Sequence, residues 1–206
     1  MTGIRAQQKE KTRRAIIDGA LSLLSAEHSY ASLSMREVCR EAKIAAPSFY
    51  HHFKDMEELG LTLVDEAGLT LRQLMRKARK RIDNGRGVIR ISIETFMEFV
   101  TQNPNIFRLL LRERSGTSVA FRAAVSREIK HFREELVAYT LAVTPYSQEV
   151  AEQQSDAMII LAFNAGAEAL DCSQEELKLL KAKTISQLRF LAIGVRAAQA
   201  QEDALP

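Results

Sequence analysis

Two adjacent histidines in the stretch APSFYHHF, residues 46–53, are the most chemically capable side chains of the sequence. Imidazole nitrogens bind metals and exchange protons near neutral pH. Successive helical residues point about 100° apart, so His51 and His52 are poorly placed to share an ion, and no carboxylate or cysteine is positioned to help them. Tyr50 and Ser48 add hydroxyl groups that can donate and accept hydrogen bonds. Contact with a partner surface is the favoured chemistry, although His52 could instead be a packing residue.

A short helix and a tight turn must position this stretch. Ser34 followed by Glu37 forms a capping-box pattern, which predicts a helix at about 35–42. The turn KIA comes next. Pro47 then marks the first turn of a second short helix, at about 46–52, because proline lacks the amide hydrogen that a first turn leaves unpaired.

The second short helix has an inward side and an outward side. Phe49 and Phe53 stand four residues apart, so both can turn inward and anchor the helix. An earlier helix, predicted at about 12–27, would brace the pair. This order is the plan of a helix-turn-helix, at about 34–53.

The rest of the chain also has the pattern of helices. Asp55 is a candidate N-cap, Ser173 with Glu176 forms a second capping box, and DNGRG (83–87) supplies a glycine turn. Further helices are predicted at about 55–83, 88–101, 105–113, 118–142, 147–171 and 174–199. No strand pattern emerges. We therefore expect an all-α protein with a first domain over 1–54 and a larger helical body over 55–206.

Composition limits the cellular setting and the partner. No run of ~18 apolar residues is present to span a membrane, and the polar N-terminus does not resemble a secretory signal. Cys39 and Cys172 are isolated, which fits a reducing cytoplasm. Residues 1–54 carry nine Lys or Arg against five acidic residues, a net +4 in a chain of net +3. This asymmetry fits either an acidic polymer as partner or a basic solubilising face.

Motifs of common enzymes are missing from the sequence. It contains no G-x-S-x-G, H-E-x-x-H, P-loop or dinucleotide fingerprint, and its Ser, His and Asp residues form no convincing constellation. We therefore expect no enzyme, no metal and no cofactor. Besides an enzyme, the alternative to a helix-turn-helix protein that binds DNA is a helical scaffold or acyl carrier that does not bind DNA.

The stretch SMREVCREAKIAAPSFYHHFKDMEELGL resembles the signature of the TetR family of transcriptional regulators, over about residues 10–65. Three positions depart from the usual pattern: Lys43 replaces the commonest turn glycine, Cys39 an alanine and Met56 a lysine. The resemblance implies a nine-helix fold with an N-terminal DNA-binding domain and a helical ligand-binding and dimerisation domain. It also implies a homodimer that binds palindromic double-stranded DNA.

The resemblance further implies roles for individual residues on DNA. Tyr50 and Lys54 would contact backbone phosphates, and residues at the start of the second short helix would face base edges. Arg5, Lys9, Lys11, Arg13 and Arg14 would form a flexible basic arm or first turn, although a solvated tail is the alternative. The residues expected at DNA are Arg14, Ser34, Arg36, Ala46, Pro47, Ser48, Tyr50, His51 and Lys54.

A narrower resemblance covers nearly the whole chain. FYHHF, LRQLMRKARKRI, FRLLLRERSGTSVAFRAAVSREI and GAEALD are similar to segments of FabR and DesT, repressors of that family. It implies control of unsaturated fatty acid genes and a long-chain fatty acyl-CoA, or related acyl thioester, as effector. A drug or another small hydrophobic ligand is the alternative.

An acyl chain needs a deep apolar tunnel, and its charged carrier needs a basic mouth. The expected wall residues are Phe99, Phe107, Leu111, Phe121, Val125, Phe132, Met158 and Phe163. Phenylalanines at helical spacing are also ordinary core residues. Arg112, with Arg108 and Arg114, is expected at the mouth, or else in solvent or in ion pairs between helices.

The last two predicted helices have the composition of a pairing surface. MIILAFNAGAEAL is apolar on nearly every side. Two such helices from each subunit would form a four-helix interface, unless both are simply internal. The small-residue face is Ala162, Ala165, Gly166 and Ala169, and the last helix adds Leu177, Leu180, Thr184, Leu188, Leu191 and Val195.

Overall fold

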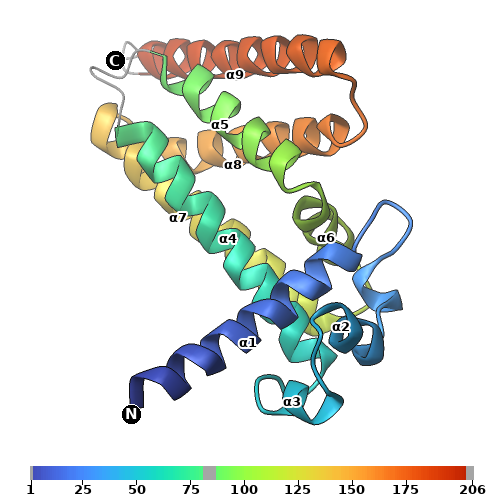
Figure 1. Ribbon diagram of the computed structural model, residues 1–206. Helices are drawn as coiled ribbons and strands as arrows, with labels where there is room; N and C mark the ends of the chain where they lie inside the picture. The colour runs from blue at the N-terminus through green and yellow to red at the C-terminus, as the bar shows by residue number, and fades with distance from the viewer. Residues whose placement is uncertain (1, 81–86, 203–206) are drawn as a thin grey trace. The chain divides into compact units, whose positions relative to one another are not determined.

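The structure is a computed structural model that describes residues 2–80 and 87–202 (Figure 1). Over these residues the chain forms nine α-helices and one 3-10 helix and contains no strand, so the all-α prediction is confirmed. The elements are α1 (Thr2–Leu23), η1 (Tyr30–Ser32), α2 (Met35–Glu41), α3 (Ala46–Tyr50), α4 (Met56–Lys80), α5 (Val88–Gln102), α6 (Pro104–Arg114), α7 (Val119–Val143), α8 (Gln148–Ala169) and α9 (Gln174–Glu202).

The chain divides into two compact units, each with its own core. Unit 1 comprises the chain up to Ala67 together with Asn105–Ser126. Unit 2 comprises Gly68–Pro104 and the chain from Arg127 onward. Helices α4 and α7 therefore contribute residues to both units.

Unit 1 is built around short helices packed on α1. Helix α1 packs against α2, and α2 against α3. The Tyr30 and Phe121 rings lie 5.6 Å apart, and the Tyr30 hydroxyl donates a hydrogen bond to the Met56 carbonyl at 2.5 Å. Both rings cover Gly60, where a Cβ atom would stand 2.6 Å from Tyr30 Cε1. Glycine at this position thus lets two aromatic rings approach the backbone of α4.

Local sequence signals set the starts of several helices. The Ser34 side chain accepts a hydrogen bond from the Glu37 amide, and the Glu37 carboxylate accepts one from the Ser34 amide. Ser173 and Glu176 form the same reciprocal pair before α9. Asp55 accepts a hydrogen bond from the Glu58 amide before α4. These three predicted N-caps are confirmed.

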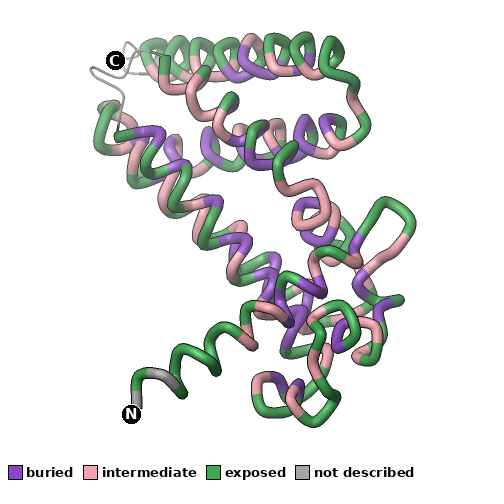
Figure 2. Tube along the Cα trace, viewed as in Figure 1, coloured by how far each residue is buried: buried purple, intermediate pink, exposed green. Residues whose placement is uncertain are grey.

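Helix α1 differs from its prediction at both ends. It begins at Thr2 rather than at about residue 12, and it ends at Leu23 rather than at about residue 27. The early part is rich in Ala, Gln, Lys and Arg, which are strong helix formers. Residues 3 and 5–11 of this part are exposed, as Figure 2 shows, so no apolar stripe marks them in the sequence. At the other end the Ser25 side chain accepts hydrogen bonds from two following amides and turns the chain away.

Unit 2 contains a packed group of helices and a charged helix pair. Helices α5, α8 and α9 pack on one another (Figure 1). Ion pairs join α4 to α7. Gly87, just before α5, adopts a left-handed conformation with φ 81°, as a glycine can at little cost. The predicted last turn of α4 and the turn 83–86 lie outside the described residues.

Candidate functional site

Helix α3 places an exposed phenol beside buried anchors. Phe49 and Phe53 are both buried, with ring centroids 5.8 Å apart, as the sequence pattern predicts. Tyr50 follows Phe49 directly and is 60% exposed. An apolar anchor that fixes the backbone next to an exposed hydrogen-bonding group gives a rigid contact surface.

The other predicted contact residues of this region share the exposed side. Ala46, Pro47, His51 and Lys54 are exposed, and Ser48 is half-buried. Together with Tyr50 they form what we call the α3 surface. Small apolar groups, hydroxyls, an imidazole and an ammonium group suit the methyl groups, acceptors and phosphates of a DNA groove.

The turn that leads to α3 has an unusual backbone. Lys43 adopts φ 55°, a left-handed conformation that is uncommon for residues other than glycine. Its amide donates to the Arg40 carbonyl at 3.2 Å, and the Ile44 amide donates to Cys39 at 3.0 Å. The turn therefore keeps the conformation that glycine would allow, with an exposed lysine side chain in its place.

Three predicted DNA contacts lie outside α3. Ser34 is exposed, but its hydroxyl is already bonded to the Glu37 carboxylate at 2.6 Å. Arg36 is exposed one residue into α2. Arg14 pairs with Asp18 and Glu66, both at 2.9 Å, so a phosphate must compete with two carboxylates for it.

His52 lies on the inner side of the same region. The Arg13 guanidinium stands 4.6 Å from the centre of the Phe53 ring. The Nδ1 atom of His52 is buried and has no hydrogen-bond partner. Burial lowers the pKa of His52, and the nearby Lys9, His51 and Arg13 side chains lower it further. His52 is therefore a neutral residue among cations at neutral pH.

A cavity of about 820 Å³ opens in unit 2, between α4, α5, α7, α8 and α9. Its walls are mainly apolar and aromatic. Three of the predicted wall residues, Phe132, Met158 and Phe163, line it. The rings of Phe163 and Phe96, which is also a wall residue, are 5.9 Å apart.

The other predicted wall and mouth residues do not line this cavity. Phe99 is buried in unit 2 away from it. Phe107, Leu111, Phe121 and Val125 belong to unit 1, as do Arg108, Arg112 and Arg114. Arg112 donates hydrogen bonds to the carbonyls of Ser25 and Ala26, so it ties α6 to the loop after α1. Helical periodicity identifies inward-facing residues but not the core they enter.

Sequence reasoning missed Arg79, a buried cation of the cavity wall. Arg79 lines the cavity, is only 8% exposed, and lies 5.7 Å from the centre of the Tyr139 ring, another wall residue. The segment LRQLMRKARKRI contains three arginines at helical spacing, Arg72, Arg76 and Arg79. Because residues three and four apart lie on the same side of a helix, this spacing could have predicted one charged face on α4.

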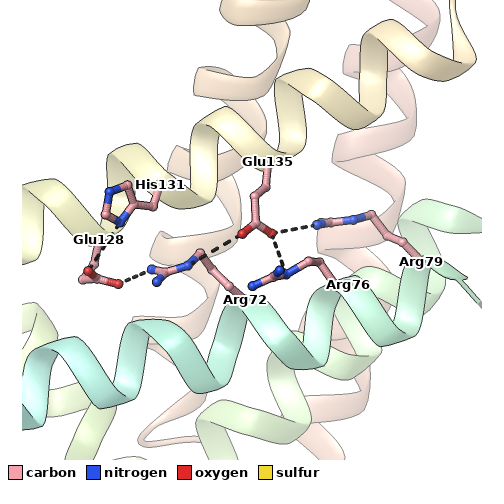
Figure 3. Close-up of polar contacts among 6 residues, drawn as sticks. All are labelled: Arg72, Arg76, Arg79, Glu128, His131 and Glu135. Atoms are coloured by element: carbon pink, nitrogen blue, oxygen red, sulfur yellow. Dashed lines mark hydrogen bonds and ion pairs between the residues drawn. The ribbon is translucent and has the colours of Figure 1, made fainter.

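Those arginines form a network with α7 (Figure 3). Glu135 is 3.3 Å from Arg76, 3.5 Å from Arg79 and 3.7 Å from Arg72. Arg72 also pairs with Glu128, and His131 lies 3.5 Å from the same carboxylate. Burial lowers the pKa of Arg79, and the Glu135 charge opposes that effect.

The last two helices expose apolar side chains that the prediction did not name. Ile160 of α8 and Leu179, Phe190 and Ile193 of α9 are large and exposed. Six of the ten predicted pairing residues are buried inside unit 2, namely Ala165, Gly166, Ala169, Leu180, Thr184 and Leu188, whereas Ala162, Leu177, Leu191 and Val195 are half-buried. The expected small-residue face is therefore used within the chain, and a different face of α8 and α9 is exposed.

Within 2–80 and 87–202, no group of three or more His, Cys, Asp or Glu is arranged to hold a metal ion. No helix in that part of the chain is long and apolar enough to cross a membrane.

Comparison with known proteins finds the same arrangement in bacterial regulators. Residues 16–62 match the family model described as "Bacterial regulatory proteins, tetR family", and residues 86–194 match "Tetracyclin repressor-like, C-terminal domain". An "Uncharacterized HTH-type transcriptional regulator" of Haemophilus influenzae is 59% identical over 202 residues, which cover 98% of each chain.

Solved structures of low sequence identity share the fold. A TetR-family regulator from Streptomyces coelicolor has a TM-score of 0.75 at 20% identity, over 95% of this chain and 86% of its own. A regulator from Aquifex aeolicus has a TM-score of 0.71 at 19% identity, over 87% and 99%. The fatty acid degradation regulator FadR of Bacillus halodurans has 0.67 at 13% identity, over 86% and 96%. The predicted nine-helix fold is thus confirmed.

Proposed function

Because the chain belongs to the TetR family of bacterial helix-turn-helix transcriptional regulators, we propose that it is a dimeric repressor of unsaturated fatty acid synthesis or desaturation genes. It binds palindromic operators in the cytoplasm, where bacterial DNA lies, and senses a long-chain fatty acyl-CoA or related acyl thioester. The α3 surface is the observation that carries DNA binding. The resemblance of the chain to FabR and DesT carries the choice of genes and effector.

The α3 surface has the properties that operator binding needs. Tyr50 can donate to a phosphate, and exposed Lys54 supplies a positive charge one turn further along the chain. Ala46, Pro47, Ser48 and His51 offer the short groups that can approach base edges. Phe49 and Phe53 are buried and hold α3 in place, so the exposed side chains of α3 can contact DNA while the core packing stays unchanged.

The cavity of unit 2 supports a hydrophobic effector. Its volume of about 820 Å³ lies in the ~300–1,000 Å³ range of small-molecule sites. Phe96, Phe132, Met158 and Phe163 provide apolar walls for an acyl chain. The exposed arginines 90, 189 and 196 also line it and can meet the phosphates of a carrier group.

The exposed face of α8 and α9 supports a homodimer. One helix-turn-helix reaches only a few base pairs, so a palindrome needs two copies. These two helices expose four large apolar side chains to solvent, those of Ile160, Leu179, Phe190 and Ile193. A second copy that covers them removes this exposed apolar surface from water.

Selection of bound sequences from a random duplex pool, followed by affinity measurements with acyl-CoA, tests the proposal. We expect a palindromic consensus, a complex of two chains per site, and an operator affinity that oleoyl-CoA and palmitoyl-CoA change differently. A pool without enrichment would refute sequence-specific binding. Enrichment without any response to either thioester would leave the regulator standing and favour a different hydrophobic effector, such as a drug.

A further inference from the structure

We infer that the cavity of unit 2 is a site for an amphipathic monoanion, an apolar chain that ends in a free carboxylate, and that Arg79 binds this carboxylate in exchange with Glu135. This inference rests on the proposed effector site and goes beyond it, because it assigns the same cavity a second ligand class, a free acid, beside the acyl thioester, which has no carboxylate. Such a site would bind a free acid more tightly than an uncharged ester or alcohol of equal length. An apolar tunnel alone would not discriminate between them.

The position of Arg79 is the first argument. A guanidinium is always charged in proteins, and burying it is costly unless partners compensate. Arg79 is nearly buried, it lines the cavity, and its ring contact is Tyr139 on the same wall. A charged group in this place makes a purely apolar ligand a poor match for the cavity.

The charge balance of the network is the second argument. Among the described residues of this network, Arg72, Arg76 and Arg79 face the two carboxylates of Glu128 and Glu135 (Figure 3). Three positive charges thus share two negative charges. A ligand carboxylate brings the network to neutrality.

The weak pairing of Arg79 makes the exchange feasible. Its distance to Glu135 is 3.5 Å, at the outer limit of a charge-assisted hydrogen bond. Arg76 stands nearer to the same carboxylate, at 3.3 Å, and Arg72 also reaches it. Glu135 therefore keeps two cationic partners when a ligand takes Arg79, so the exchange leaves no carboxylate alone.

An unpaired polar atom in the same wall is an independent sign of a ligand or water. Gln154 lines the cavity and is buried, and its Oε1 atom has no hydrogen-bond partner. A buried acceptor without a partner is unfavourable, and the ligand carboxylate has no donor to offer it, so a water that donates to both groups would fit there. The cavity thus has polar groups on its wall that the protein itself does not satisfy.

Binding at Arg79 would act on α4 directly. Arg72, Arg76 and Arg79 all lie on α4, and the network that joins them to α7 is the one that the ligand would enter. Helix α4 is the element that follows the α3 surface in the chain. A carboxylate that redistributes these ion pairs therefore biases the helix next to the DNA-contacting residues.

Equilibrium dialysis of the full chain with radiolabelled dodecanoate and 1-dodecanol, below their solubility limits, tests the inference. We expect the wild type to bind dodecanoate about tenfold or more tightly than dodecanol, as a charge-assisted bond allows. Arg79→Gln should lose this preference while its dodecanol affinity stays within about twofold. Arg79→Lys keeps the charge and should retain part of the preference for dodecanoate. This variant still tests the inference if Arg79→Gln fails to fold.

Arg76→Gln is the matched control. Arg76 belongs to the same network but does not line the cavity, so its loss should leave the preference for dodecanoate intact. Equal wild-type affinity for acid and alcohol would overturn the inference, and so would an equal loss of preference in both arginine variants. An operator response to oleoyl-CoA in that case would leave the proposed function standing.

Discussion

The Tyr50 ring stands edge-on to the ring of its neighbour Phe49, with centroids 5.8 Å apart and planes at 85°. Phe49 is 0% exposed and Tyr50 is 60% exposed. Two consecutive aromatic residues of one helix therefore have opposite roles. The first fixes α3 in unit 1, and the second is exposed to solvent.

This division predicts that two alanine substitutions differ strongly in their effect on the free energy of unfolding. Phe49→Ala should lower the free energy of unfolding by about 3–5 kcal/mol, because it leaves a cavity in a packed core. Tyr50→Ala should change it by less than about 0.5 kcal/mol. Urea denaturation followed by circular dichroism measures both. Similar losses in the two variants would show that Tyr50 is a core residue after all.

Gly60 predicts a reversal of the usual helix rule. Replacing glycine by alanine inside a helix normally stabilises it by about 0.5–1 kcal/mol. At Gly60 the new Cβ would lie 2.6 Å from Tyr30 Cε1 and overlap the Phe121 ring, so Gly60→Ala should destabilise the protein by about 1–3 kcal/mol.

A second substitution tests the cause of this reversal. In the background of Phe121→Leu the cost of Gly60→Ala should shrink, because the smaller side chain can yield. Thermal melts of the four proteins give the coupling energy. Additive effects would show that the ring is not what excludes a side chain at position 60.

The exposed apolar face of α8 and α9 predicts the surface of the dimer. Phe190→Asp should convert the dimer to a monomer, because a carboxylate would be buried in an apolar interface. Val119 of α7 is as exposed as Phe190, 71% against 70%, and provides the control. Size-exclusion chromatography with light scattering should find Val119→Asp still dimeric. A dimeric Phe190→Asp protein would place the interface elsewhere.

The capping box of α2 predicts a pH-dependent contribution to stability. Hydrogen bonds from the Ser34 side chain and the Ser34 amide lower the pKa of Glu37 below its ordinary value of 4.5. A lowered folded pKa means that the stabilisation is complete above about 4.5 and is lost as the pH falls through the folded value.

Glu37→Gln tests this dependence. At neutral pH the wild type should have the higher urea midpoint, and the gap should close in acid because Gln resembles the protonated carboxyl group. A gap that does not vary with pH would mean that the ionised carboxylate adds nothing to the cap.

Much of the fold follows from signals that are local in the sequence. Ser34 with Glu37 and Ser173 with Glu176 lie three residues apart, so their reciprocal hydrogen bonds could be predicted without knowledge of any other helix. Phe49 and Phe53 were predictable for the same reason. The early part of α1 was missed because it has helix propensity but no buried face.

The cavity could not be predicted to the same extent, because its walls come from five helices. Phe107 and Phe132 look alike in the sequence, yet the first is buried in the core of unit 1 and the second lines the cavity of unit 2. Arg112 and Arg79 are both arginines of amphipathic helices, yet only Arg79 of the two lines the cavity. Which core a residue enters depends on long-range packing, and periodicity carries no information on it.

Lys54 of the α3 surface and Arg14 of α1 should differ in their effect on DNA binding. Lys54 is exposed, whereas Arg14 is paired with Asp18 and Glu66. Lys54→Ala should weaken binding to all sequences and reduce the slope of log affinity against log salt by about one. Arg14→Ala should have the smaller effect on the slope, because its charge is already balanced. Fluorescence anisotropy at several salt concentrations compares them, and a larger effect of Arg14→Ala would contradict this ranking.

The affinity of Tyr50 variants for the selected operator tests the central claim most directly. Tyr50→Phe removes only the hydroxyl, and Tyr50→Ala also removes the ring, while both leave Phe49 in place. We predict that both variants fold and dimerise like the wild type and that both bind the operator at least about tenfold more weakly, since each lacks the phosphate contact. Wild-type operator affinity in a folded, dimeric Tyr50→Ala protein would contradict the assignment of the α3 surface to DNA.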